Sequence, residues 1–354
     1  MQQHLKKNSD IISLLRLPLI VGVVFIHSIK LSQGYFPLYD FCYSFITEGI
    51  CQVCVPLFFF SSGYLFFQNV DKFDIRIYKS KIKRRISSLL IPFIFWNLFV
   101  VAIIGTGQIL CPSLFSGAFK NVLDFDAKDW LSIFYCSLGT NKPIAYQLWF
   151  LRDLILMSAI TPIIYCLCKH LKFWFIGTLM VLYILGVKSL VTGLSFFSLF
   201  FYCTGCWFGV NKIKFYFESN GLRWVSIVSF VILLILVLFL KNDYWAYLIQ
   251  RTNVIIGCIA VVQLAFLYIE KRDVTDVFVN RKSISNSSFF IYCYHGIFAT
   301  FLGKFAENIV ANDFEAVIVY FAIVIFLVIF GVLAYNVLLR TLPRFTGVIT
   351  GGRN

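Results

Sequence analysis

Residues 11–31 read IISLLRLPLIVGVVFIHSIKL, an apolar run interrupted by only three ionisable side chains, Arg16, His27 and Lys30. A helix needs about 20 mainly apolar residues to cross the hydrocarbon core of a bilayer. The run therefore predicts a membrane-spanning helix. It does not indicate a cleavable signal peptide, because it is too long, contains Arg16 and lacks a small-residue cleavage site.

The rest of the 354-residue chain is also apolar, with 60% hydrophobic and 14% charged residues and a mean hydropathy of +0.83. Average chains contain about 45–50% apolar and about 25% charged residues. We therefore expect an all-α polytopic membrane bundle of about ten transmembrane helices, in one domain over residues 1–354 with no appended soluble domain. The expected spans are 11–31, 46–68, 88–111, 146–168, 172–190, 194–210, 222–240, 246–268, 286–305 and 315–339.

The longest polar connection covers residues 112–145 and carries most of its charges between Lys120 and Asp129. Apolar and aromatic residues return immediately afterwards, at Trp130-Leu131-Ser132-Ile133-Phe134. We expect a short interfacial helix at this point.

The net charge of +14 could indicate a nucleic-acid partner, so the position of the cations matters. With a cytoplasmic N-terminus and ten alternating spans, 21 of the 31 Lys and Arg residues are cytoplasmic, 7 lie opposite and 3 lie inside spans. This excess follows the positive-inside rule. We therefore expect cytoplasmic N- and C-termini and no nucleic-acid partner.

The 11 cysteines lie mostly inside apolar runs, without zinc-finger spacing to partner histidines. Cys51 and Cys54 form an isolated pair in an apolar segment. We interpret the cysteines as small buried hydrophobic residues and expect no metal site.

Arg16 and His27 are candidates for function because ionisable groups inside a span cost several kcal/mol. Eleven helical steps separate the two residues by ~16 Å along the helix axis. Their directions differ by about 20°, so the two side chains share one helix face. This arrangement favours a ligand that enters from the cytoplasm and reaches a proton-transfer group deeper in the bundle. The structural alternative is a snorkelling arginine and a histidine that is hydrogen-bonded to a neighbouring helix.

The arginine, ten residues and histidine of this span resemble the signature of the membrane acyltransferase family 3. The sequence departs from the family pattern at Lys81, three residues before Arg84 where a basic pair is frequent, and at Gln147, where histidine is frequent. Further stretches resemble motifs of that family in the expected order: VPLFFFSSGY at 55–64, KRRI at 83–86, LLIPFIFW at 89–96, QLWFL at 147–151 and FIYCYH at 290–295.

The resemblance implies an enzyme of the bacterial inner membrane that transfers an acyl group to a carbohydrate hydroxyl. The implied donor is acetyl-CoA or another acyl-CoA, used as a substrate rather than as a permanently bound cofactor. The implied acceptor is an envelope saccharide or a lipid-linked glycan. We expect His27 to act as general base, with an acyl-histidine intermediate as second choice. Arg16 would orient the donor or stabilise charge on the thioester oxygen.

The donor side is expected at the basic loop 72–85. Lys81, Arg84 and Arg85 supply cations for a polyanionic coenzyme A, and an arginine fork suits bidentate phosphate contacts. The alternative is ordinary positive-inside charge that attracts anionic membrane lipids. Ser62 and Gly63 permit close backbone approach, either to the donor or to another helix.

Four residues are candidates for the acceptor side: His295, Trp149, Arg251 and Gln147. Each has a structural alternative. His295 could pair with a neighbouring helix, Arg251 could snorkel, and Trp149 could serve packing or the interfacial belt. Arg152 and Asp153 are expected to neutralise each other inside the bundle.

A carrier or flippase for a lipid-linked saccharide, without acyl transfer, is the rival hypothesis. Ten spans, aromatic lining and buried ions would serve such a carrier equally well. The one-face pair of Arg16 and His27 behind a basic cytoplasmic loop favours the enzyme, because a saccharide carrier does not require that pair.

Overall fold

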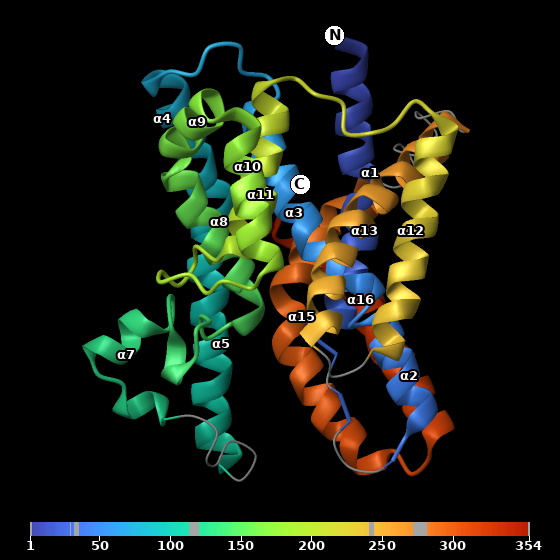
Figure 1. Cartoon of the computed structure of the whole chain (residues 1–354). Coiled ribbons are helices and arrows are strands. Elements are labelled where there is room, and N and C mark those ends of the chain that lie inside the picture. The colour runs from blue at the N-terminus through green and yellow to red at the C-terminus, as the bar shows by residue number, and fades with distance from the viewer. Residues whose placement is uncertain are drawn as a thin grey trace.

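The computed structural model describes residues 2–28, 30–31, 35–112, 120–240, 244–271 and 282–352. Within these ranges all regular secondary structure is helical (Figure 1), which confirms the predicted all-α class. The α-helices are α1 (Gln2–Ile26), α2 (Pro37–Ile46), α3 (Cys54–Phe67), α4 (Ile75–Arg85), α5 (Ile91–Leu110), α7 (Ala127–Ser132), α8 (Trp149–Ala159), α9 (Thr161–His170), α10 (Lys172–Ile184), α11 (Phe196–Val210), α12 (Asn220–Phe239), α13 (Tyr244–Glu270), α15 (Lys282–Ile309), α16 (Asp313–Thr341) and α17 (Pro343–Ile349). Short turns lie at η1 (Ile50–Val53), η2 (Ile86–Leu90), η3 (Val122–Asp124), η4 (Ser137–Gly139) and η5 (Tyr146–Leu148).

Each of the ten predicted spans falls on a helix or a helix pair, but not all are long enough to cross a membrane. Seven helical segments of the described residues have the required length and apolar composition. The predicted span 146–168 is a helix pair, Tyr146–Ala159 and Thr161–His170, bent by 66°. The predicted spans 172–190 and 194–210 correspond to α10 and α11, with only 13 and 15 residues. At ~1.5 Å per residue both are shorter than a hydrocarbon core of about 30 Å.

Two prolines account for breaks in the helices. Pro92 lacks an amide hydrogen and its ring crowds the carbonyl of Ser88. The chain accommodates it with the π-helical turn η2, which joins α4 to α5 into one continuous helical segment, Ile75–Leu110. Pro162 stands at the start of α9, where its missing donor is tolerated, and α8 ends just before it at Ala159. Arg85 is the last residue before the π-helical turn, which sets its position in the site described below.

A short helix is confirmed in this segment as α7, which begins three residues earlier than expected and lies beside the far end of α5 in Figure 1. Asp126 caps its first turn, because the carboxylate accepts hydrogen bonds of 2.8 Å from the amides of Lys128 and Asp129. Lys120 bonds Asp129 at 2.5 Å and joins the preceding loop to the helix.

Helices α3 and α11 pack backbone to backbone at the centre of the bundle. A Cβ atom at Gly63 would clash with the carbonyl oxygen of Tyr202, and one at Gly205 would clash with the carbonyl oxygen of Phe60. Small residues at facing positions allow this close approach between membrane helices. The contact fixes α3, whose other residues line the candidate site.

Polar contacts tie distant segments together at one end of the bundle. Asn8 donates to the carbonyl of Ile213 at 3.2 Å, and Ser9 bonds Gln68 at 3.3 Å. The ammonium of Lys212 lies 2.6 Å from the carbonyl oxygen of Gln68. The N-terminal segment, the chain before α4 and the α11–α12 connection therefore share one end of the molecule, as Figure 1 shows.

The outer surface of the bundle is apolar. Only 22% of the most apolar stretch of α12 and 28% of that of α16 is buried inside the protein, against 56% for the stretches of α3 and α15. Large exposed hydrophobic residues on the two outer helices include Val225, Ile232, Ile325 and Ile329. Such a surface is suited to lipid rather than to water. The protein is therefore an integral membrane bundle with α3 and α15 towards its interior.

Candidate functional site

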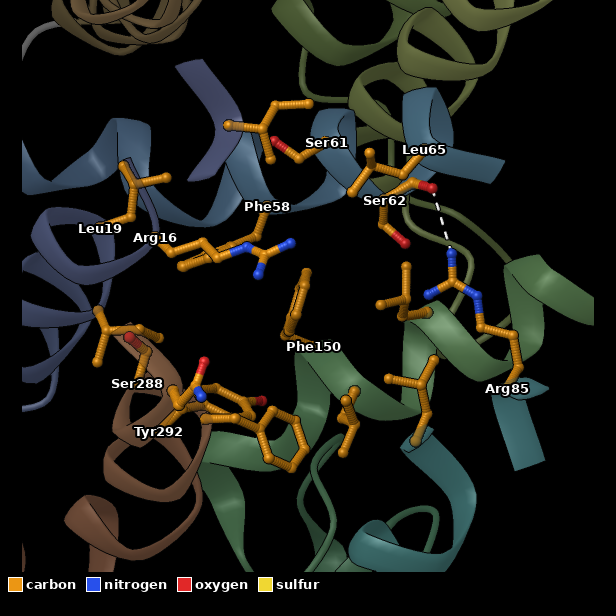
Figure 2. Close-up of a pocket in the computed structure, with 17 residues that line it drawn as sticks. Arg16, Leu19, Phe58, Ser61, Ser62, Leu65, Arg85, Phe150, Ser288 and Tyr292 are labelled. Carbon is orange, nitrogen blue, oxygen red and sulfur yellow. Dashed lines mark hydrogen bonds between the residues drawn. The ribbon is translucent and has the colours of Figure 1, made fainter. Parts of the chain in front are cut away.

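A cavity of about 310 Å³ lies between α1, α3, α8 and α15, beside the turn η2. Apolar and aromatic side chains make up most of its wall, including Phe58, Phe150 and Tyr292. Arg16 and Arg85 are the charged side chains among the described residues that line it (Figure 2). The cavity therefore combines an apolar wall with two fixed cations.

Arg16 extends from α1 into the cavity, where its side chain is exposed (Figure 2). Within the described part of the chain its guanidinium has neither a carboxylate partner nor a hydrogen-bond acceptor. An unpaired charge inside a membrane bundle is costly, and such groups mark ligand or ion pathways. We infer that Arg16 is kept for an anionic ligand.

Arg85 enters the cavity from the opposite side, at the junction of α4 and η2. Its Nη2 atom donates to the carbonyl oxygen of Ser62 at 3.2 Å, and its guanidinium lies over the ring of Phe66 with a centroid distance of 5.8 Å. The Ser62 hydroxyl also faces the cavity in Figure 2, and its Oγ is buried without a hydrogen-bond partner among the described residues. Arg85 and Ser62 therefore present hydrogen-bonding atoms to the same wall of the cavity, where a ligand could contact them.

His27, the residue that follows the end of α1, contacts two aromatic rings from other elements. The ring centroids of His27 and His295, from α15, lie 5.2 Å apart, and the ring of Tyr146, from η5, lies 5.2 Å from that of His27. Neither ring nitrogen of His27 has a hydrogen-bond partner among the residues that the structure describes. His27 therefore lies next to a second histidine and has a ring nitrogen that is available to accept a proton.

The cavity and the histidine pair meet along α15. Tyr292 lines the cavity, and its ring centroid lies 6.2 Å from that of His295, which is one turn farther along the helix. Arg16 and Tyr292 line the same cavity, and the rings of His27 and His295 lie next to each other. Both residues of the predicted pair therefore lie on the side of α1 that packs against α15. A ligand held at Arg16 would therefore reach toward His27 along this helix.

Comparison with known protein families agrees with this arrangement. Residues 10–337 match the family described as an acyltransferase domain, acyltransferase 3. The chain belongs to this acyltransferase family. The match begins inside α1 and includes Arg16, His27 and the whole of α15.

The acyltransferase is also similar to the succinoglycan biosynthesis protein ExoH of Rhizobium meliloti (strain 1021). The two are 30% identical over 161 residues, which is 43% of this chain and 41% of that protein. The matched part therefore spans less than half of the relative. No solved structure matches the chain.

The other expected donor-side residues occupy different places in the acyltransferase. Lys81 lies with its ammonium 5.2 Å from the centroid of Phe66, on the ring that also contacts Arg85, but it does not line the cavity. Arg84 is exposed and does not line the cavity either. Gly63 faces α11 rather than the cavity, so its lack of a side chain serves helix packing.

Two of the expected acceptor-side residues have structural partners near the histidine pair. Gln147, from η5, is buried against α15, and its Nε2 donates to the carbonyl of Cys293 at 2.7 Å. Trp149 packs among the aromatic rings of Phe59 and Phe197. The structure thus places Gln147 beside His295 and assigns Trp149 to packing.

Arg251 lies away from both groups. Its guanidinium donates to the carbonyl of Tyr183 and contacts the ring of Tyr247 at 4.1 Å from the centroid. These contacts bind α13 to α10. The structure therefore does not bring Arg251 together with Arg16 or His27.

Sequence reasoning missed several lining residues, among them Phe150, Asn286, Ser288 and Tyr292. One signal was available: the first turns of the span 286–305 carry Asn and Ser where neighbouring spans carry Leu, Ile and Phe. Polar residues at the start of an apolar helix indicate a face turned away from lipid. Tyr146, which contacts His27, lies outside any regular pattern and carries no such signal.

Proposed function

We propose that this membrane acyltransferase transfers an acyl group, in the first instance acetyl, from a cytoplasmic acyl-CoA to a hydroxyl of an envelope or lipid-linked saccharide. The observation that carries the proposal is the cavity that contains Arg16 and Arg85, with Arg16 unpaired among the described residues. Coenzyme A is polyanionic, and guanidinium groups bind phosphate oxygens through two parallel hydrogen bonds.

The donor would enter from the end of the bundle that carries α4. That end holds the basic residues of the segment before Arg85, several of which are exposed. The positive-inside distribution favours a cytoplasmic location for this end and for both termini, in a bacterial inner membrane. The donor is proposed as a substrate that leaves after each turnover, and no permanently bound cofactor is required.

The reaction follows from the position of His27 on the same helix face as Arg16. A sugar hydroxyl is a poor nucleophile until a base takes its proton. His27 would accept that proton while the hydroxyl oxygen attacks the thioester carbonyl. The carbon–sulfur bond then breaks, and the coenzyme A thiolate recovers the proton from His27. Arg16 would orient the donor by binding its phosphates, ~16 Å from His27 along the helix.

The saccharide acceptor is supported by the similarity to ExoH, whose name assigns it to succinoglycan biosynthesis. The segment around Tyr146 and Gln147 adjoins the histidine pair and is proposed to contact the acceptor. In the experiment below, mass spectrometry of the labelled glycan identifies the sugar that receives the acyl group.

The rival hypothesis, a saccharide carrier without chemistry, is disfavoured by membership of an acyltransferase family. The carrier hypothesis also does not explain why Arg16 and His27 share one helix face. A carrier would use buried ions to bind its cargo, but it would not need a base next to a cavity that is suited to a polyanion.

The test uses the purified protein in lipid nanodiscs with isotopically labelled acetyl-CoA and envelope glycans from cells that lack the protein. Mass spectrometry should show label on the glycan. His27→Ala should lower the rate by about 10²- to 10⁴-fold and retain coenzyme A binding. His170→Ala is the matched control, because His170 is an exposed histidine at the end of α9. Equal transfer by the His27→Ala and His170→Ala variants would remove His27 from the mechanism.

A further inference from the structure

His295 has a fixed tautomer. Its Nδ1 atom lies 2.8 Å from the carbonyl oxygen of Tyr292 and 3.0 Å from that of Ile291. Carbonyl oxygens only accept hydrogen bonds, so Nδ1 must carry the hydrogen. In the neutral ring the other nitrogen, Nε2, is then bare and can only accept a hydrogen bond.

That Nε2 atom is buried and unsatisfied. The residue is 0% exposed, and Nε2 has no hydrogen-bond partner among the residues that the structure describes. Leaving a buried acceptor unpaired costs about 1–3 kcal/mol, and such groups require an explanation. Hydrogen bonding to its own helix accounts for only one of the two ring nitrogens.

The neighbour of this side chain is His27. The two ring planes are inclined at 44° with centroids 5.2 Å apart. The rings are close enough for a hydrogen bond between two ring nitrogens if they turn edge to edge, although the structure shows them without that bond. The ring of Tyr146 contacts His27 from another direction, and its hydroxyl donates to the carbonyl of Gly296 at 3.2 Å. Tyr146 is therefore held on α15 next to the same pair of histidines.

We propose that His295 is a positioning residue for His27: its Nε2 accepts a hydrogen bond from a ring N–H of His27, so that the other His27 nitrogen stays bare for the acceptor hydroxyl. This inference rests on the proposed function, in which His27 is the base. When His27 takes the proton of the hydroxyl, its hydrogen bond to His295 becomes charge-assisted and stronger. The proton then passes to the coenzyme A thiolate, and His295 itself is unchanged.

A neutral partner suits this depth in the membrane. Among the described residues no carboxylate contacts either histidine ring. A buried carboxylate would orient a catalytic histidine strongly, but a charge inside a span is expensive when no ligand is present. A histidine locked in one tautomer supplies the acceptor without that charge.

Two amide variants of His295 separate this role from a purely structural one. His295→Asn places an amide donor near the Nδ1 position and keeps the bond to the helix carbonyls, but it has no atom at the Nε2 position. His295→Gln reaches the Nε2 position with an amide oxygen and loses the Nδ1 donor. If His295 has only a structural role, His295→Asn should transfer acyl groups faster than His295→Gln. If His295 positions His27, His295→Gln should be the faster variant.

We expect His295→Asn to lower kcat for acyl transfer by about tenfold or more, with KM for acyl-CoA unchanged, because loss of an orienting acceptor acts on the reacting base. His295→Gln should transfer at least tenfold faster than His295→Asn. Coenzyme A affinity and thermal unfolding, measured on both variants, check that each is folded.

Equal kcat for the two variants, or a faster His295→Asn, would overturn the inference while leaving the proposed function intact. Absence of acyl transfer by the unmodified protein would instead refute the proposed function. If both amide variants fail to fold, His295→Ala with externally added imidazole provides the second measurement. Imidazole should raise transfer by His295→Ala and leave the His170→Ala control unchanged, and no response would contradict the positioning role.

Discussion

The Nη1 atom of Arg152 lies 2.9 Å from the carbonyl oxygen of Asn141, although Arg152 is buried in α8 and Asn141 lies in an exposed loop. The same atom lies 2.7 Å from the carbonyl of Tyr135, and the Nε and Nη2 atoms of Arg152 donate to Asp153 at 3.0 and 2.8 Å. One guanidinium thus fixes the loop that leads into Tyr146. The predicted mutual neutralisation of Arg152 and Asp153 is confirmed, and the arginine also braces the chain next to His27.

Removal of this guanidinium should destabilise the protein. Arg152→Met leaves the Asp153 carboxylate buried without its cation, which typically costs about 3–5 kcal/mol. The midpoint of thermal unfolding in detergent should fall clearly. The double variant Arg152→Met with Asp153→Asn removes the isolated charge and should recover part of the loss, but not all, because the bonds to the loop carbonyls remain broken. An unchanged midpoint in the single variant would contradict the brace.

The glycines of the bundle provide a second pair of matched variants. Gly63→Ala places a methyl group against the carbonyl of Tyr202 and should separate α3 from α11, with a large loss of thermal stability and of folded yield. Gly177→Ala is the control, because nothing lies within 4 Å of the added Cβ and Gly177 is inside α10. Alanine is favoured over glycine in a helix by about 1 kcal/mol, so the control should be neutral or slightly stabilising. Similar unfolding midpoints for the two variants would contradict the close packing.

The sequence was sufficient for the positions of the helices, because burial in lipid depends on local composition. Each expected span falls on a helix or helix pair, and the helical phase between Arg16 and His27 correctly predicted that both face one neighbour. Composition could not show that α10 and α11 are short or that α8 and α9 meet at a 66° bend. These features depend on the neighbours against which a helix packs.

The sequence does not distinguish neighbouring side chains that have different environments. Arg84 and Arg85 are adjacent and equally basic, yet of the two only Arg85 lines the cavity, because successive residues of a helix point about 100° apart. His27 and His295 are far apart in the chain, and no local pattern indicates that their rings meet. Such long-range contacts require the folded structure.

The orientation in the membrane is open to direct measurement. Lys79 is exposed on α4, and Lys128 is exposed on α7 near the opposite end of the bundle (Figure 1). In a cysteine-free background, Lys79→Cys should react only after the membrane is permeabilised, and Lys128→Cys should react in intact cells. The expectation follows from the excess of cations on the side of α4. Labelling of position 79 in intact cells would reverse the proposed topology.

Binding of coenzyme A tests whether the cavity holds the donor, because substitutions of two adjacent arginines should have different effects on the affinity. Arg85→Ala removes a guanidinium that lines the cavity and should weaken binding of coenzyme A by about tenfold to 100-fold, since hydrogen bonds to charged groups contribute about 1.5–3 kcal/mol. Arg84→Ala removes the same charge from an exposed position outside the cavity and should leave the affinity nearly unchanged. The measurement is calorimetric titration of purified protein with coenzyme A at fixed ionic strength.

Arg85→Lys refines this comparison, because it keeps the charge and loses the planar fork that binds phosphate through two bonds. Its affinity should fall between those of the unmodified protein and Arg85→Ala. If Arg84→Ala and Arg85→Ala weaken binding equally, the effect is the general attraction of a basic surface, which added salt would screen. A loss confined to Arg85 that persists at high salt would instead place the coenzyme A phosphates inside the cavity, on the wall that Arg85 shares with the unpaired hydroxyl of Ser62.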